Sequence, residues 1–267
     1  MKYIGSKARL SKIIVPIVNN LIYKYKIDTY SEPFVGGANI IDKIVCKNKI
    51  GYDLNEYLIE MWNKLKAGYI PPMNISKEEY LEVKNNIENY TKEYVGIVGF
   101  CATYNAGWFR RYGGTAITKD GKIRNYYQEA IRNIQKQIPN LKNVIFIHEN
   151  FKNLNFNNNF IYCDPPYKDS KYEMYKDTNF DYELYYNKVR EWSEANIVLC
   201  SEYYMPSDFV CIYEKTLTTT LDKNSRKKDT EKLFIHEKLY EKIKDNINNK
   251  KPIIEITKLT IDNTYKQ

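Results

Sequence analysis

The chain alternates short apolar runs with amphipathic stretches, and this order predicts a parallel sheet flanked by helices. Apolar residues recur at helical spacing over 11–26, short strands are predicted at 29–34 and 49–54, and a helix is expected over 40–45 between them. Asn55 is placed to cap a further helix that ends near residue 65. This succession is typical of an α/β fold with helices on both faces of the sheet.

The middle of the chain differs from its two flanks. Residues 68–142 carry several helical patterns and no strong strand, and Ser76 with Glu79 forms a capping box at the start of one helix. The α/β alternation then resumes, with strands predicted at 143–148, 159–163, 196–201, 208–213 and 232–236 and a helix over 181–195 capped by Asp181. Residues 68–142 are therefore expected to be an insertion into the α/β domain, and the segment after Lys238 is a charged tail.

Composition and charge narrow the choice of partner. The 267 residues, 43% of them hydrophobic, suffice for one large domain or a core with a smaller insert. The formal net charge of +8 suits a polyanionic partner, although a solvated lysine-rich surface explains the charge equally well. Tyrosine is abundant, at 26 residues, so a single tyrosine says little about function.

Cysteine and histidine usage argues against secretion and against metal chemistry. The five cysteines include no CxxC pair, and three of them sit in apolar runs, as expected for reduced thiols in the cytoplasm. The first residues lack the long apolar run of a signal peptide or membrane span. Only two histidines occur, His148 and His236, which disfavours a histidine metal site or a Ser-His-Asp triad.

The chemically most informative motif is Asp164-Pro165-Pro166-Tyr167, which follows the apolar strand 160–163. Asp164 can accept one N–H of an exocyclic amine, and the carbonyl of Pro165 or Pro166 can accept the other. The prolines fix φ and keep these acceptors aimed, while Tyr167 offers a flat face for a base. The motif predicts a pocket that recognises and activates the amino group of a nucleobase.

Two further motifs fall where the first two strands end. The loop 32–37, Glu-Pro-Phe-Val-Gly-Gly, allows close approach of a ligand but lacks the GxGxxG pattern of dinucleotide sites, and a plain tight turn is the alternative. Asp53 ends the second strand, where a carboxylate commonly accepts ribose hydroxyls, although a helix cap is the alternative. In segment 3–7, a lysine after a glycine turn could meet a carboxylate, or could belong to a frayed basic terminus.

Taken in order, these motifs resemble the Dam-type, D12 class DNA adenine-N6 methyltransferases. The motifs YIGSK, EPFVGG, the aspartate of YDLNEYLI, and DPPY follow one another in the same order as in the family. The likeness continues through 197–203 and 226–235. It spans residues 1–237 and is to phage and prophage enzymes rather than to the housekeeping GATC enzyme. The resemblance implies a Rossmann-like methyltransferase domain over 1–67 and 143–267, with an inserted, mainly helical target-recognition domain over 68–142.

The resemblance also implies S-adenosyl-L-methionine as cofactor, double-stranded DNA as partner, and no metal. The cofactor is expected at Tyr3, Lys7, Glu32, Phe34, Gly36, Asp53, Asn150, Phe151 and Asp164, with Asp164, Pro165, Pro166 and Tyr167 forming the pocket for a flipped-out base. Two positions depart from the family: Asn150 stands where an aspartate is frequent, and Ala38 where a glycine is frequent. An ordinary φ at Ala38 is expected, since a helix start would supply it.

DNA recognition is assigned to the aromatic, basic and glycine-rich stretch 103–124. The expected DNA contacts are Tyr104, Asn105, Trp108, Arg110, Arg111, Arg124 and, from the basic run 223–228, Lys227. Packing in the core is the alternative for Trp108 and Phe109, and simple solvation is the alternative for the basic run. The Asn-Val-Pro segment of the family's GATC readers is missing, so GATC is not carried over.

Alternatives to DNA adenine methylation stay open at this point. Enzymes acting on RNA bases or protein glutamine usually have Asn where this chain has Asp164, and cytosine-N4 enzymes usually have Ser, so the aspartate favours adenine. A catalytically silent DNA-binding protein is the second alternative, although the intact DPPY and glycine loop argue against it. The recognition sequence, the oligomeric state and the role (restriction partner, phage self-protection or epigenetic mark) do not follow from the sequence.

Overall fold

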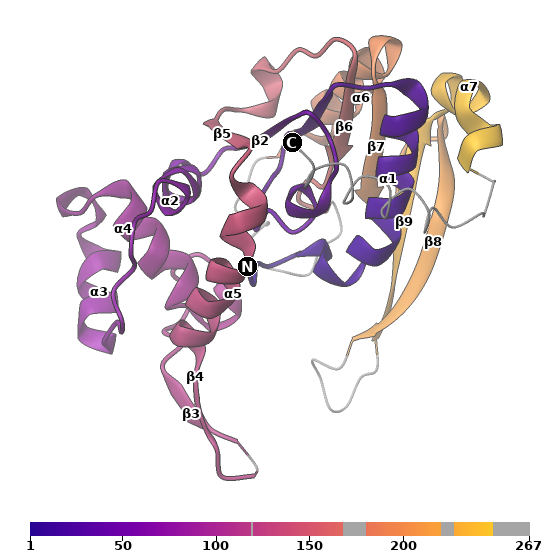
Figure 1. The fold of residues 1–267 in the computed structure, drawn as a ribbon. Helices are drawn as coiled ribbons and strands as arrows, with labels where there is room; N and C mark the ends of the chain where they lie inside the picture. The colour runs from indigo at the N-terminus through magenta and orange to yellow at the C-terminus, as the bar shows by residue number, and fades with distance from the viewer. Residues whose placement is uncertain (119, 168–179, 220–226, 248–267) are drawn as a thin grey trace, which may run out of the picture.

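The computed structural model describes residues 1–118, 120–167, 180–219 and 227–247, and its centre is a seven-stranded sheet (Figure 1). The strands are β1 (Thr29–Glu32), β2 (Asn48–Asp53), β5 (Val144–His148), β6 (Asn159–Cys163), β7 (Ile197–Glu202), β8 (Phe209–Thr219) and β9 (Lys227–His236). Their order is β5-β2-β1-β6-β7-β9-β8. The first five strands are parallel, and β9 runs antiparallel to β7 and β8. The predicted Rossmann-like α/β sheet is thus confirmed.

The strand order reverses in the middle of the sheet. β1 is the first strand in sequence and lies in the middle of the sheet. β2 and β5 follow on one side of it, and β6 and β7 lie on the other side. Ligands of doubly wound sheets bind beyond the carboxyl ends of the strands at such a reversal. β1 ends there at Glu32, and Asp164 directly follows β6.

Helices cover both faces of the sheet at β6 and β7, which explains why these two strands read as continuous apolar runs. The surrounding helices include α1 (Ser11–Tyr25), α2 (Glu56–Lys66), α6 (Tyr182–Ala195) and α7 (Glu237–Ile247). Along β6, Phe160 and Tyr162 point into the core shared with α1 and α2, while Ile161 and Cys163 point into the core under α6. Side chains alternate across a strand, so one strand supplies both cores.

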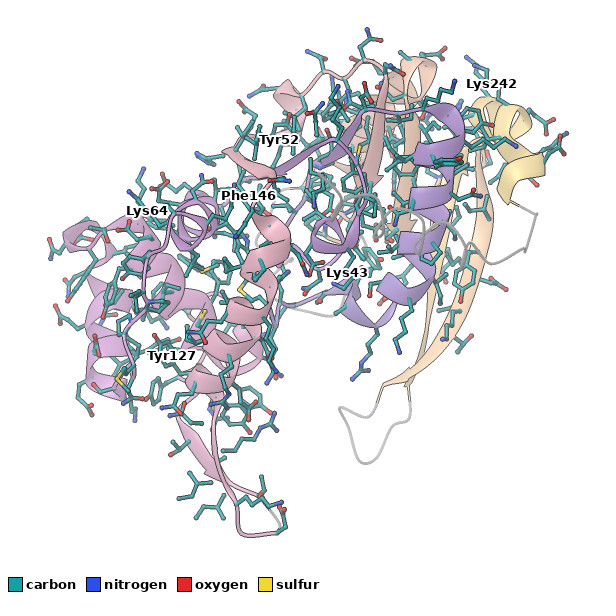
Figure 2. All side chains as sticks on the ribbon, in the orientation of Figure 1. Lys43, Tyr52, Lys64, Tyr127, Phe146 and Lys242 are labelled. Carbon is teal, nitrogen blue, oxygen red and sulfur yellow. The ribbon has the colours of Figure 1, made fainter. Side chains whose placement is uncertain are left out.

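A second group of elements stands beside the sheet, towards the lower left of Figure 1. It contains α3 (Lys77–Asn85), α4 (Lys92–Gly96), the π-helical turn η4 (Ile97–Cys101), the hairpin β3 (Thr115–Ile117) and β4 (Ile123–Asn125), and α5 (Tyr126–Leu141). The predicted capping box of Ser76 and Glu79 is present at α3. Buried Tyr127 lies inside this group (Figure 2), and its core is continuous with the core over α1 and α2.

The loop after β1 differs from the sequence prediction. The expected helix over 40–45 is only the 3-10 turn η2 (Ile41–Lys43), and Ala38 has a left-handed φ of 53° rather than an ordinary one. Gly36 is also left-handed, with φ 45°, so the chain turns twice in succession. Gln137 of α5 donates to the carbonyls of Gly37 (3.1 Å) and Ala38 (2.7 Å) and so fixes this turn just before the expected helix.

Two hairpins extend from the molecule towards the same side in Figure 1. One is β3–β4, which the sequence did not predict; the other is β8–β9, whose strands are longer than the predicted 208–213 and 232–236. Among the described residues, no helix has both the length and the apolar character that crossing a membrane requires.

Candidate active site

A cavity of about 1190 Å³ opens at the carboxyl ends of the central strands. Its wall is built by the N-terminal segment 1–10, the loop after β1, the end of β6, the loop 104–111, one side of α5, and Glu231 of β9. The cavity brings together the predicted site residues Tyr3, Lys7, Glu32, Phe34, Gly36, Asp164, Pro165, Tyr167, Tyr104, Asn105, Arg110 and Arg111. Segments far apart in the sequence therefore meet at one place.

The other predicted site residues do not line this cavity. They are Asp53, Asn150, Phe151, Pro166, Trp108 and Arg124, together with Lys227, which begins β9 and whose side chain lies outside the described part of the chain. Asn150 caps the 3-10 turn η6 (Phe151–Asn153) by accepting the N–H of Lys152 at 3.1 Å.

Asp164 leaves β6 as a nearly buried carboxylate facing a lysine. Nζ of Lys7, in the 3-10 turn η1 (Lys7–Arg9), lies 2.8 Å from Oδ1 of Asp164. The two groups are an ion pair by distance but not an aligned hydrogen bond, and Oδ1 has no hydrogen-bond donor among the described residues. Burial raises the pKa of Asp164 to about 6, against the opposing effect of Lys7. Oδ1 is itself buried against the Lys7 ammonium, so a ligand N–H can reach it only if that ammonium moves.

Tyr167 is fixed in place by its hydroxyl. The hydroxyl donates to Oε2 of Glu231 at 2.9 Å, and the edge of the ring meets Tyr203 with centroids 4.6 Å apart. The Lys7 ammonium lies over the ring face, 4.3 Å from its centroid. Burial and the nearby carboxylates raise the pKa of Tyr167 well above its usual range, so its hydroxyl remains a donor.

The two prolines of the motif have different surroundings. The Pro166 carbonyl accepts a hydrogen bond from the Tyr182 hydroxyl at 3.1 Å, and Pro166 does not line the cavity. Pro165 lines the cavity, and its carbonyl accepts no hydrogen bond from the described residues. Of the two carbonyls that the sequence left open, that of Pro166 already has a donor in Tyr182, and that of Pro165 has none among the described residues.

The loop after β1 packs under the N-terminal segment. A Cβ on Gly36 would lie 2.8 Å from the Tyr3 ring, and one on Gly37 would lie 2.7 Å from Cβ of Tyr3, so the glycines permit this contact. Glu32, 3% exposed, accepts the Tyr30 hydroxyl at 2.7 Å. Burial raises its pKa to about 8, which favours the protonated form near neutral pH.

Asp53 accepts one backbone N–H from the glycine loop and one from the start of the following helix. Oδ2 accepts the N–H of Gly36 at 3.0 Å, and Oδ1 accepts the N–H of Asn55 at 3.0 Å, at the start of α2. Burial raises the pKa of Asp53, while these backbone hydrogen bonds lower it. The carboxylate therefore sets the position of the loop, and any ribose contact would be additional to this role.

An aromatic cluster lies at the same end of the sheet, beside the glycine loop. Phe151 stacks on Phe180 with centroids 5.1 Å apart, and Phe34 contacts both rings at 5.4 and 5.9 Å. Phe34 also lines the cavity, so the cluster forms an apolar margin to it. Phe180 was missed from the sequence, as were Tyr182 and Glu231. The Asp181 cap between Phe180 and Tyr182 was a helix signal only, and the family likeness over 226–235 included Glu231 without giving it a role.

The residues expected to bind DNA fall into two groups. Tyr104, Arg110 and Arg111 are exposed on the cavity wall, around the left-handed Asn105 (φ 57°). Trp108 instead packs between Tyr57 and Phe100, with centroid distances of 5.4 and 4.8 Å, and Phe109 is buried. The contacts of Trp108 and Phe109 are those of core residues.

Arg124 lies on β4, away from the cavity. It makes a bidentate pair with Glu129, at 2.5 and 2.9 Å, and lies over Tyr126. Two of the N–H groups of its guanidinium are therefore already paired with Glu129 and are not free to contact DNA.

The charges of the cavity are segregated. Acidic side chains lie on its floor at Asp164, Glu231 and the largely protonated Glu32, whereas exposed cations lie on its wall at Arg9, Arg110, Arg111 and Lys136. Such an arrangement suits a cationic group at the floor and a polyanion across the opening. Over the residues that the structure describes, no group of three His, Cys, Asp or Glu side chains is arranged to hold a metal ion.

Comparison with known proteins gives a family match over most of the chain. The family model of the D12 class N6 adenine-specific DNA methyltransferases matches residues 3–220. The type II methyltransferase M.FokI of Planomicrobium okeanokoites is 25% identical over 188 residues, which cover 62% of this chain and 28% of that protein. The chain thus spans little more than a quarter of the length of this curated relative.

Solved structures give weaker matches. A structure described as a putative RNA methyltransferase, PH1948, from Pyrococcus horikoshii superposes with a TM-score of 0.38 and 8% identity, over 82% of this chain and 81% of that one. A putative rRNA methylase from Clostridium thermocellum superposes with a TM-score of 0.34 and 8% identity, over 83% and 96% of the two chains. These scores are too low to support an argument, and the fold rests on the sheet described above.

Proposed function

The chain belongs to the D12 class of N6 adenine-specific DNA methyltransferases, and on this premise we propose that it methylates the N6 amine of adenine in double-stranded DNA, with S-adenosylmethionine as donor. One observation carries the proposal. The Asp164 carboxylate and the Pro165 carbonyl both border the cavity beside the face of Tyr167, and neither accepts a hydrogen bond from the described residues at the atoms concerned.

These two acceptors fit the hydrogens of an exocyclic amine. The nitrogen of such an amine is a weak nucleophile, because its lone pair is delocalised into the ring. With one N–H donated to Oδ1 of Asp164 and the other to the Pro165 carbonyl, the nitrogen becomes more tetrahedral and its lone pair is directed away from both acceptors. The motif thus orients and activates the amine without a covalent intermediate.

The residues around the glycine loop fit the methyl donor. Glu32, Phe34 and Gly36 line the cavity next to Asp164, and would hold the amino-acid and sulfonium parts of the donor. Phe34, Phe151 and Phe180 offer aromatic faces for its adenine, and Asp53 fixes the loop from behind. When bound, the donor supplies an electrophilic methyl group on a positively charged sulfur.

The acidic floor of the cavity suits the charge that develops during transfer. As the amine nitrogen becomes positive, the ionised Asp164 stabilises it from a site already in place. The proton that the nitrogen then loses can pass to Oδ1 of Asp164, whose pKa of about 6 allows release at neutral pH. In this proposal Asp164 binds the substrate amine and receives its proton.

Recognition of DNA is proposed for the group of elements between residues 68 and 142. Its loop carries Tyr104, Asn105, Arg110 and Arg111 to the cavity wall, where they can contact phosphates or base edges. Because the amine is paired inside a duplex, the target base must leave the stack to reach Asp164 and lie on Tyr167. The core contacts of Trp108 make it an unsuitable wedge for the vacated space.

The proposal is tested by following tritium from labelled S-adenosylmethionine into unmethylated genomic DNA, and then digesting the product to nucleosides. The expected product is N6-methyl-2′-deoxyadenosine, absent with Asp164→Ala. Label in N4-methylcytosine, in RNA or in protein would assign another acceptor, and donor binding without transfer to any of them would contradict the proposal.

A further inference from the structure

Lys7 lies where the proposed function places the target amine. Its Nζ is 2.8 Å from Oδ1 of Asp164 and 4.3 Å from the centroid of the Tyr167 ring. An adenine stacked on Tyr167 with its amine on Asp164 requires this same volume. The Lys7 side chain is only 5% exposed, so its ammonium is enclosed in the site and is not a passing surface contact.

A second carboxylate, that of Glu231, lies near the Lys7 ammonium. Oε2 of Glu231 is 3.9 Å from Nζ of Lys7, while Nζ donates an aligned hydrogen bond to the carbonyl of Gly5 at 3.0 Å. A movement of about 1 Å towards Glu231 would bring Nζ within hydrogen-bond range of Oε2. Glu231 already accepts the Tyr167 hydroxyl, so it joins the lysine to the ring on which the base would lie.

We propose that Lys7 occupies the amine position in the free protein and moves to Glu231 when the target adenine enters. The inference rests on the proposed function and assigns Lys7 and Glu231 as positioning residues for Asp164. In the first position the ammonium fills the amine site above Tyr167. In the second it leaves Oδ1 to the adenine amine while remaining inside the cavity.

The charge balance supports movement between two partners rather than expulsion to solvent. Burial and the charge of Glu231 already raise the pKa of Asp164, so removing the Lys7 cation would further disfavour the ionised form that the reaction needs. With Lys7 on Glu231, one positive charge remains near both carboxylates. The methyl donor is itself cationic, so its binding would weaken the attraction between Lys7 and Asp164 and prepare the site for the base.

The charged and titratable groups that face Asp164 come from every element around it. They are Lys7 of η1, Glu32 of β1, Tyr162 of β6, Tyr167 after β6 and Glu231 of β9. Lys7 lowers the pKa of Asp164 and Glu231 raises it, so removing each charge has an opposite effect. This opposition separates the inference from a purely structural role.

The test compares Lys7→Met, Glu231→Gln and Lys7→Arg with the wild-type protein. First, carbon NMR of the Asp164 carboxyl in the free proteins gives its titration midpoint without any need for activity. Lys7→Met should raise this midpoint by about one pH unit, a tenfold change in proton affinity. Glu231→Gln should lower it, and Lys7→Arg, which keeps the charge, should leave it near the wild-type value.

Methylation kinetics on unmethylated DNA, with the dissociation constant of the donor measured alongside, test the movement itself. Lys7 lacks its second partner in Glu231→Gln, and the larger guanidinium of Lys7→Arg can bridge both carboxylates. Both variants should therefore raise KM for DNA by about tenfold, the worth of one charge-assisted hydrogen bond. Retained donor binding shows that a variant is folded.

The outcomes distinguish the inference from the proposed function. If wild-type protein transfers no methyl group to DNA, the proposed function fails and the inference fails with it. If wild-type protein is active but Lys7→Met and Glu231→Gln keep the wild-type Asp164 midpoint, or Glu231→Gln and Lys7→Arg keep the wild-type KM for DNA, the inference alone is wrong. A structure with DNA and S-adenosylhomocysteine in which Nζ of Lys7 remains on Asp164 would also overturn it.

Discussion

The Tyr182 hydroxyl donates a hydrogen bond to the Pro166 carbonyl at 3.1 Å and so joins the start of α6 to the motif that follows β6. Asp181 fixes this helix start, because its side chain accepts the N–H of Leu184 at 2.9 Å. The cap and the hydroxyl together hold the second proline in place. Pro165, one residue earlier, lines the cavity, and its carbonyl has no hydrogen-bond donor among the described residues.

Removing the Tyr182 hydroxyl should therefore slow methyl transfer without abolishing donor binding. We expect Tyr182→Phe to lower kcat by roughly two- to tenfold, in line with the net worth of one hydrogen bond. Single-turnover methylation and equilibrium binding of the donor measure the two effects. Tyr23→Phe, at an exposed position of α1, is the matched control and should change neither. An equal loss of kcat in both variants would show that the hydrogen bond from Tyr182 to Pro166 does not support methyl transfer.

The pH dependence of methylation should report the raised pKa of Asp164. Amine binding needs the ionised carboxylate, so the rate should fall as pH decreases through about 6, where burial places its pKa. A carboxylate with an ordinary pKa would give a midpoint near 4. Rates at saturating donor from pH 5 to 9 measure the midpoint, and Glu32→Gln should keep this acid limb. Full activity at pH 5 would argue against ionised Asp164 as the acceptor.

Asp53 should matter to the glycine loop more than to the helix that follows it. Asp53→Ala removes the acceptor of the Gly36 and Asn55 N–H groups and should cost about 1–3 kcal/mol of unfolding free energy. It should also weaken donor binding more than tenfold, because the loop loses its support. Urea unfolding and calorimetry of donor binding measure these changes.

Asn55→Ala is the control for that experiment. It removes the cap of α2, in which the side chain accepts the N–H of Leu58 at 2.9 Å, and should cost about 1 kcal/mol. Donor affinity should stay near the wild-type value. If both variants lost donor affinity equally, the effect of Asp53 would be general destabilisation.

Arg111 and Arg124 should differ in their contribution to DNA binding. Arg111 is exposed on the cavity wall, whereas Arg124 is paired with Glu129 on the hairpin. Arg111→Ala should weaken binding and reduce the slope of log K against log salt by about 1, the loss of one phosphate contact. Arg124→Ala should change the slope less. Fluorescence anisotropy over a salt series measures both, and the reverse order would move the DNA path to the hairpin.

The sheet and the helix starts could be predicted from the sequence because local rules decide them. Asn55, Ser76 and Asp181 cap helices as expected, and the apolar runs at 159–163 and 197–202 became strands buried on both faces. The helix over 40–45 was wrong, since only the 3-10 turn 41–43 forms there. The turn before it depends on a distant residue: Gln137 binds the carbonyls of Gly37 and Ala38, and Ala38 adopts a left-handed φ that its sequence alone does not favour.

The composition of the site was only partly predictable, for a related reason. Asp164 and Tyr167 could be predicted as site residues because an aspartate, two prolines and an aromatic at a strand end suit the binding of a nucleobase amine better than the packing of a core. The pairing of Lys7 with Asp164 and the contact of Glu231 with Tyr167 depend on how η1 and β9 converge on β6. No local pattern encodes that convergence, and only the folded chain reveals it.

The central claim is that Asp164 directs methylation of adenine in DNA. Single-molecule sequencing that detects N6-methyladenine, on DNA from a methylation-deficient host expressing the wild-type chain or Asp164→Ala, tests it most directly. N6-methyladenine is expected at one recurring sequence with the wild-type chain and nowhere with the variant. Unmodified adenine in both strains, or equal modification in both, would contradict it.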